Sequence, residues 1–248
     1  MILIFSDLHL GRFKDQDASL LTDIESCLNK YSVKPSTQLE EVIFLGDVFD
    51  SFMEYPSNIS GYALQFSGLL KTLLKKGINV SYHVGNHDPW HSSFFSGILG
   101  NNLYFAPVRR KLSSRQAYLS HGDEASTYNY RGRIARYFMR STFWYRTYTT
   151  VLPSTAGQKI PAWISRKFAG LEPRQKTIDN LKYAAHEILG NSNVDLVLFG
   201  HAHQSVSELT SDGQYVNTGS WLLSRSYVEI SEESVNIRLY SNERPSAS

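Results

Sequence analysis

The chain has 248 residues, of which 42% are hydrophobic and 19% are charged, and its formal net charge is +2. This composition suits one globular domain with a sizeable core and excludes a disordered or fibrous chain. The single cysteine, Cys27, excludes an internal disulfide and fits a reducing compartment. Because no apolar run is long enough to cross a bilayer and no basic leader precedes Asp7, we expect a cytoplasmic protein.

The first half of the chain predicts three strands separated by helices. Each of these strands ends in a turn that carries a side chain of a metal-binding type. Apolar runs predict strands over residues 2–6, 41–45 and 78–84, and helical spacing predicts helices over 18–30 and 59–76. The polar residues that follow the strands are, in order, Asp7 and His9, then Asp47, then Asn86 and His87.

The second half repeats this pattern twice. Predicted strands over residues 116–120 and 194–199 are followed by His121 and by the pair His201 and His203. Residues 215–221 and 226–240 predict antiparallel strands that close a second sheet, and we expect a frayed tail over 242–248.

Each of these strand endings has an ordinary explanation when it is taken alone. Asp7 could cap a helix, and Asn86 could belong to a simple turn. Five such endings favour convergence instead, because the carboxyl ends of strands meet at one edge of an open sheet. The candidate ligands are Asp7, His9, Asp47, Asn86, His121, His201 and His203. Seven ligands in one cleft suit two divalent ions that share a carboxylate. Oxygen and imidazole donors without thiolates suit Mn, Fe, Co or Zn.

In order, type and spacing these motifs resemble those of the calcineurin-like metallophosphoesterase superfamily, over about four fifths of the chain. The resemblance implies an α/β fold, an α/β/β/α sandwich that holds two metal ions. It also implies two ligand sets that share Asp47. The sets are Asp7, His9, Asp47 and His203 for one ion, and Asp47, Asn86, His121 and His201 for the other.

Two further residues are candidates for catalysis. His87 adjoins a candidate ligand, and imidazole as a group can donate a proton near neutrality, so we predict that His87 protonates the leaving group. In the phosphoprotein phosphatase branch an acid at the position of Asp50 orients such a histidine. The resemblance therefore implies the same role for Asp50.

Residues 125–176 form a basic insertion between His121 and His201, with the core expected over 1–124 and 177–241. The insertion contains ten Lys or Arg and one acidic residue; when these are subtracted from the totals of 25 and 23, 15 basic and 22 acidic residues remain elsewhere. Pro153 and Gly157 divide it into two predicted helices. We expect a helical hairpin lid with a cationic face and an aromatic face, which binds an amphiphile at the inner face of a membrane.

The candidate substrate-binding residues are Asn86, Arg131, Arg133 and Arg136. A structural alternative for the insertion is that its apolar face packs on the core while its arginines are solvated. The near absence of acidic residues favours the lid, because a merely solvated face normally mixes both signs.

The insertion and residues 217–221, Asn-Thr-Gly-Ser-Trp, are similar to those of UDP-2,3-diacylglucosamine hydrolases of lipid A biosynthesis. This resemblance implies hydrolysis of the pyrophosphate of UDP-2,3-diacylglucosamine to UMP and 2,3-diacylglucosamine 1-phosphate, usually with Mn. The chain departs from that family at His87, where an Arg is common.

Two other functions remain open at this stage. A nucleic-acid or nucleotide phosphodiesterase of the same superfamily would also use a basic, aromatic rim, because aromatic rings stack on bases. A non-catalytic scaffold that binds a membrane or a protein would not need a complete set of seven ligands.

Overall fold

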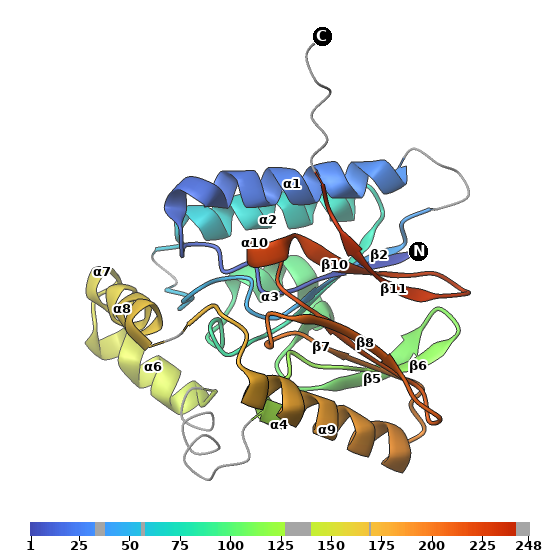
Figure 1. The fold of residues 1–248 in the computed structure, drawn as a ribbon. Helices are drawn as coiled ribbons and strands as arrows, with labels where there is room; N and C mark the ends of the chain where they lie inside the picture. Colours follow the sequence, from blue (N-terminus) through green and yellow to red (C-terminus); the bar gives the residue numbers. More distant parts are fainter. Residues whose placement is uncertain (33–37, 56–57, 127–139, 169, 242–248) are drawn as a thin grey trace.

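Two β-sheets lie face to face with helices on both outer sides (Figure 1). The computed structural model describes residues 1–32, 38–55, 58–126, 140–168 and 170–241. The four layers form the α/β/β/α sandwich that the sequence predicts. The predicted tail over 242–248 lies outside the described residues.

The first sheet has six strands in the order β11-β10-β1-β2-β3-β4. Strands β1 to β4 are parallel, whereas β10 and β11 form an antiparallel edge beside β1. The bounds are β1 Ile2–Phe5, β2 Glu41–Leu45, β3 Asn79–His83, β4 Leu103–Tyr104, β10 Ser226–Ile230 and β11 Val235–Leu239.

The second sheet has five strands in the order β5-β6-β7-β9-β8. Its three central strands are parallel, and both edge strands are antiparallel to their neighbours. The bounds are β5 Val108–Leu112, β6 Arg115–Leu119, β7 Leu196–Phe199, β8 Ser205–Leu209 and β9 Gln214–Thr218.

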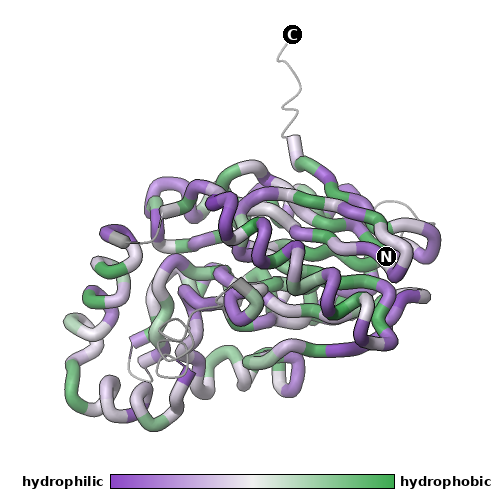
Figure 2. The backbone as a smooth tube through the Cα atoms, turned by 60° about the horizontal axis from the view of Figure 1, so that its bottom comes forward, coloured by the Kyte–Doolittle hydropathy of each residue, from purple (hydrophilic) through white to green (hydrophobic). Residues whose placement is uncertain are grey.

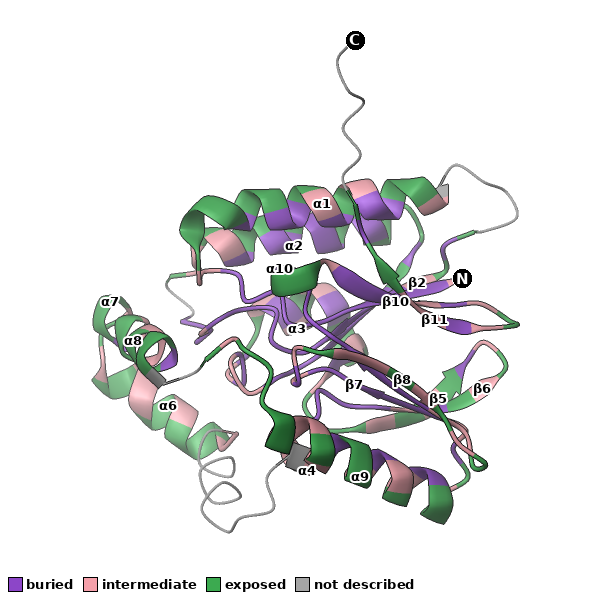
Figure 3. Ribbon diagram, viewed as in Figure 1, coloured by how far each residue is buried: buried purple, intermediate pink, exposed green. Residues whose placement is uncertain are grey.

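Helices cover the outer face of each sheet. On the first sheet they are α1 Lys14–Ser32, α2 Gly61–Lys75 and α3 Phe94–Leu99; on the second, α9 Gln175–Asn191. Strand β1 shows how the layers arise from sequence. Its Leu3 and Phe5 pack toward the helices, and its Ile2 and Ile4 pack between the sheets. An apolar run therefore fits a strand that is buried on both faces (Figure 3).

The last part of the chain corrects one prediction. Strand β10 pairs with β1 and β11 pairs with β10, so both extend the first sheet. Of the strands that follow β7, only β8 and β9 belong to the second sheet. Alternating side chains indicate a strand but do not identify its partner, which explains the error. The predicted strand over 215–221 also ends early, because Trp221 begins the short helix α10, Trp221–Ser224, which Ser220 caps.

Within the insertion, the described residues 140–168 form three helices at the end of the sandwich where the parallel strands finish (Figure 1). They are α6 Thr142–Val151, α7 Ser154–Gly157 and α8 Lys159–Phe168, and we call them the insertion helices. The chain breaks at Pro153 and after Gly157 as predicted, with the extra turn α7 between the long helices. The boundaries 125–176 of the whole insertion stay a prediction. In the described parts of the chain, no helix combines the length and apolarity that crossing a bilayer requires.

Candidate metal centre and active site

The first predicted ligand set is assembled by the structure. Asp7, His9, Asp47 and His203 offer ligand atoms that all lie within 4.8 Å of one another. Asp7 and His9 follow β1, Asp47 follows β2, and His203 follows β7. The Nε2 atom of His203 lies 3.1 Å from Asp7 Oδ1 and 3.1 Å from His9 Nε2. Strands of both sheets therefore supply one cluster at their carboxyl ends.

The second set adjoins the first through Asp47. His121 Nε2 lies 3.2 Å from Asp47 Oδ2, and the His121 and His201 rings are 5.1 Å apart at their centroids. Asp47, His121 and His201 form a cluster of their own. Asn86 lines the same cavity of about 270 Å³ as Asp47, His201 and His203. All seven predicted ligands thus lie at one site, with Asp47 in both clusters.

The backbone at the site adopts an unusual conformation. Among the described residues other than glycine, seven have positive φ, and five of these are candidate ligands, with φ from 46° to 65°. These five are Asp7, His9, Asp47, His201 and His203. Such a conformation is unfavourable for residues with a Cβ atom and is concentrated at functional sites, where the surrounding contacts enforce it.

Two glycines allow the strand ends to approach closely. A Cβ atom on Gly46 would overlap the His121 ring, and one on Gly85 would overlap the Asp47 carboxylate. Gly46 also has a φ of +86°, which glycine adopts without strain. The glycines before the ligands are therefore required by packing at the site as well as by turn geometry.

Asp88 ties the second and third strand ends together, a role that the sequence analysis missed. Its carboxylate accepts hydrogen bonds from Val48 N–H at 2.7 Å, Gly85 N–H at 2.7 Å and the Tyr82 hydroxyl at 2.6 Å. Asp88 is fully buried, so these bonds replace its hydration. The pattern Gly-Asn-His-Asp thus supplies a structural carboxylate beside Asn86 and His87.

The donor set fits metal ions, because acceptor atoms face acceptor atoms. His121 Nδ1 donates to the Leu45 carbonyl at 2.9 Å, and His203 Nδ1 donates to the Leu171 carbonyl at 2.5 Å. In the neutral rings the Nε2 atoms are then lone-pair acceptors, yet they face Asp47 and Asp7 carboxylates. The buried Asn86 Oδ1 has no hydrogen-bond partner among the described residues. Cations at this site would satisfy all of these atoms.

The electrostatics of the site also favour the binding of cations. Burial alone would lower the pKa of His121, but the neighbouring Asp47 carboxylate raises it well above its ordinary value. Burial also disfavours a protonated His203, but the Asp7 carboxylate raises the pKa of this histidine above its ordinary value. Burial lowers the pKa of His201 to about 3, so that ring stays neutral and able to bind a metal. Two of the four histidines thus attract a proton or a cation.

His87 and Asp50 lie together beside the clusters, and the Asp50 carboxylate is 4.0 Å from His87 Nδ1. His87 Nδ1 donates to the backbone carbonyl of Asp50 at 2.7 Å, which leaves Nε2 4.0 Å from Asp47 Oδ2. The Asp50 carboxylate lies closer to His9, with 3.5 Å between Oδ1 and His9 Nδ1. Asp50 therefore holds His87 through its main chain and adjoins a candidate ligand through its side chain.

The predicted substrate-binding arginines cannot be placed, because Arg131, Arg133 and Arg136 lie outside the described residues. Another basic residue of the predicted insertion lies at the site instead. Arg174 precedes α9 and lines the 270 Å³ cavity together with Thr177 in the first turn of that helix. The sequence signal for Arg174 was its place in the basic segment, but helix α9 itself went unpredicted although Leu181, Ala185 and Leu189 recur at helical spacing.

Comparison with known families agrees with this geometry. The family model for calcineurin-like phosphoesterases matches residues 1–205. The chain belongs to this family. As a calcineurin-like phosphoesterase it is a metal-dependent phosphoric ester hydrolase, and the clusters described above are its candidate metal ligands.

Curated relatives of this phosphoesterase include two UDP-2,3-diacylglucosamine hydrolases. The protein of Porphyromonas gingivalis is 25% identical over 91% of this chain and 92% of its own length. The protein of Shewanella piezotolerans is 24% identical over 95% of this chain and 96% of its own length. A solved structure of a hypothetical protein from Pyrococcus horikoshii OT3 shares the fold, with a TM-score of 0.51, 13% identity and coverage of 98% of this chain and 90% of that chain.

We expect protons and metal ions to compete for the site. Since the pKa values of His121 and His203 are raised in the metal-free protein, lowering the pH fills these sites with protons that metal must displace. Affinity for Mn²⁺ should therefore fall as the pH falls, and binding should release protons. Calorimetric titration of Mn²⁺ in buffers of different ionisation enthalpy measures both; binding without proton release would contradict the assigned ligands.

Replacement of Asp88 by Asn should destabilise the protein. The amide retains one acceptor oxygen for the buried N–H groups of Val48 and Gly85, so at least one of them loses its partner. We expect the free energy of unfolding to fall by about 2 kcal/mol. Denaturant unfolding of Asp88→Asn against the exposed control Asp212→Asn measures the difference, and equal stability would refute the structural role of Asp88.

Proposed function

We propose that this phosphoesterase hydrolyses the pyrophosphate of UDP-2,3-diacylglucosamine to UMP and 2,3-diacylglucosamine 1-phosphate. Two curated hydrolases with this substrate in their names match more than nine tenths of the chain. Identity near 25% supports the family rather than the substrate. The proposal therefore depends on the surface beside the ligand clusters.

The observation that carries the proposal is an apolar cavity joined to the metal centre. The cavity has about 400 Å³ and lies between the core and the insertion helices. Asp50, Asn86 and His87 line one end, and Trp90, Tyr148, Ile160 and Ile164 line the rest. A substrate with an acyl chain beside its phosphate would place the chain here and the phosphate at the ligands. A purely polar substrate would have no apolar group to place against this lining.

The polar cavity on the other side of Asn86 suits the phosphate. Arg174 lines it, and the first turn of α9 adds Thr177. Backbone N–H groups at a helix N-terminus and a guanidinium group both favour phosphate oxygens. We assign Arg174 to the binding of the pyrophosphate, in addition to Asn86.

The seven ligands would hold two divalent ions, for which Mn is our assignment. When bound, such ions offset phosphoryl charge and activate water for attack on phosphorus. Among the chain's own groups, His87 would hold the proton for the departing oxygen on Nε2. Its Nδ1 is engaged with the Asp50 carbonyl, so Nε2 is the ring atom left for the cleft. The Asp50 carboxylate also lies near this ring, with 4.0 Å between Oδ1 and His87 Nδ1.

The substrate assignment predicts Mn²⁺-dependent release of UMP from UDP-2,3-diacylglucosamine in detergent micelles. Metal-free protein should show no release, and single-stranded DNA added as a competing substrate should remain intact. Chromatography of the products measures both reactions. Cleavage of DNA or a simple phosphodiester without UMP release would retain the phosphoesterase and refute the lipid substrate.

The role of His87 predicts a selective loss of turnover. His87→Asn should lower kcat by about 100-fold or more, the usual contribution of a general acid, while bound metal stays at the wild-type level. Steady-state kinetics together with metal analysis of the purified variant tests this. His186→Asn serves as the control, because the His186 ring on α9 faces Glu208 of β8, with 3.5 Å between Nε2 and Oε1. Loss of metal in His87→Asn would show that His87 is a ligand instead.

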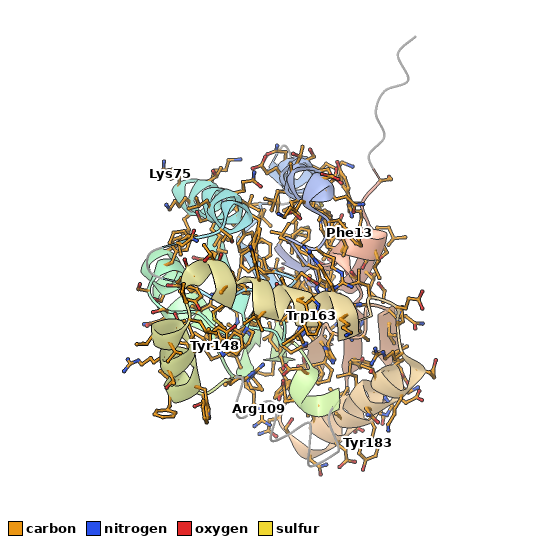
Figure 4. The ribbon with its side chains drawn as sticks, turned by 90° about the vertical axis from the view of Figure 1, so that its left-hand side faces the viewer. Phe13, Lys75, Arg109, Tyr148, Trp163 and Tyr183 are labelled. Atoms are coloured by element: carbon orange, nitrogen blue, oxygen red, sulfur yellow. The ribbon has the colours of Figure 1, made fainter. Side chains whose placement is uncertain are left out.

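We also propose that the insertion helices contact a membrane surface. Their side chains include exposed aromatic and aliphatic groups, such as Phe143 at 69%, Trp163 at 57% and Val151 at 72% exposure. Figure 2 shows hydrophobic and hydrophilic segments alternating along these helices, and Figure 4 views Trp163 and Tyr148 from that side. Exposed basic residues such as Lys159 and Lys167 lie among them. This combination suits contact with an anionic bilayer. It differs from the structural alternative, in which the apolar face of the insertion would pack entirely on the core.

Vesicle sedimentation tests the membrane contact. Trp163→Ser and Phe143→Ser together should weaken binding to vesicles that contain anionic lipid, because less apolar surface enters the bilayer. Leu209→Ser, an equally exposed change on β8, should leave binding unchanged. If the double variant sediments with the vesicles as the wild type does, the insertion helices do not provide the contact.

A further inference from the structure

One side chain of the insertion helices reaches the catalytic residues. Ser165 on α8 is only 6% exposed, and its hydroxyl donates to Asp50 Oδ2 at 3.0 Å. The Ser165 Oγ atom also accepts a hydrogen bond from Arg12 Nη1 at 3.1 Å and lies 3.4 Å from His87 Nδ1. A serine 78 or more positions away in sequence thus joins Asp50, Arg12 and His87.

The groups around Ser165 lie between a candidate ligand and the candidate acid. The Asp50 carboxylate is 3.5 Å from His9 Nδ1, and the Asp50 carbonyl holds His87 Nδ1. Arg12 Nη1 is 3.4 Å from Asp50 Oδ1. Because Ser165 contacts the other carboxylate oxygen, it fixes the rotation of Asp50 and with it the space beside the His87 ring. Partners of this kind commonly set the orientation of reacting groups.

The same face of α8 lines the apolar cavity. Ile160 and Ile164, and likewise Pro161 and Ser165, are four positions apart, so these four lining residues share one side of the helix. Whatever fills the cavity therefore bears on the helix that carries Ser165. When α8 packs on the core in this way, its Ser165 hydroxyl is placed against the Asp50 carboxylate.

We propose that Ser165 is a positioning residue, which holds Asp50 and His87 in register for proton transfer when α8 is seated on the core. The inference rests on the proposed hydrolase function and adds to it a contact between the insertion helices and the reacting groups. It concerns turnover rather than metal binding, since Ser165 contacts none of the seven ligands.

Two small substrates test this role without involving the acyl cavity. The p-nitrophenyl ester of thymidine monophosphate has a good leaving group that needs little help from an acid, whereas the phenyl ester has a poor one. Ser165→Ala should lower kcat on the phenyl ester about tenfold or more and should affect the p-nitrophenyl ester less. KM and bound Mn²⁺ should remain at wild-type values.

Two matched variants complete the experiment. Ser165→Thr keeps the hydroxyl and should recover most of the phenyl-ester kcat. Thr150→Ala removes a hydroxyl that bonds only within α6, to the Arg146 carbonyl at 2.8 Å, and should leave both substrates unaffected. Recovery in the threonine variant also separates positioning from misfolding.

The outcomes distinguish this inference from the function on which it rests. Equal losses of Ser165→Ala on both esters, no loss, or loss of metal would overturn the positioning role while the hydrolase remains. A wild-type protein that cleaves neither ester nor UDP-2,3-diacylglucosamine with Mn²⁺ would overturn the proposed function and the inference with it. If it cleaves only UDP-2,3-diacylglucosamine, an unchanged kcat of Ser165→Ala on that substrate would overturn the positioning role. A wild type that cleaves the esters but not UDP-2,3-diacylglucosamine would refute the substrate alone.

Discussion

The structure depends on the concentration of acceptor atoms around Asp47. Its carboxylate belongs to both ligand clusters, and lone pairs of histidine nitrogens face it and Asp7 from several sides. Without cations or protons these atoms would repel one another inside a buried site. Three features keep these atoms close together despite that repulsion. They are the glycines at the strand ends, the left-handed backbone at five ligands and the hydrogen bonds that the Asp88 carboxylate accepts. Fold stability and metal chemistry are therefore coupled at one edge of the sandwich.

Much of this site was predictable from sequence, because its signal is local and repeated. A buried strand followed by glycine and a metal-binding side chain occurs several times, and parallel strands bring such endings together. The seven residues did converge in the structure. The family match over residues 1–205 confirms the metallophosphoesterase fold that this pattern implied.

Features that depend on partners far along the chain were not predictable. The alternation over 226–240 identified strands but not their place beside β1, since pairing is set by the packing of whole sheets. The Asp50 carboxylate lies closer to His9 than to His87, which follows from side-chain rotation that no motif records. Ser165 and the Leu171 carbonyl reach the site from the insertion, and a serine or a backbone oxygen carries no sequence signal for such a role. The structure thus supplies the link between insertion and centre.

The most direct test of the central claim is anomalous diffraction from crystals soaked in Mn²⁺. The account predicts two Mn peaks about 3.5–4 Å apart, the separation usual in two-metal sites, with Asp47 between them. One peak should adjoin Asp7, His9 and His203, and the other Asn86, His121 and His201. A single peak, or two peaks that Asp47 does not bridge, would contradict the dinuclear centre on which this account is built.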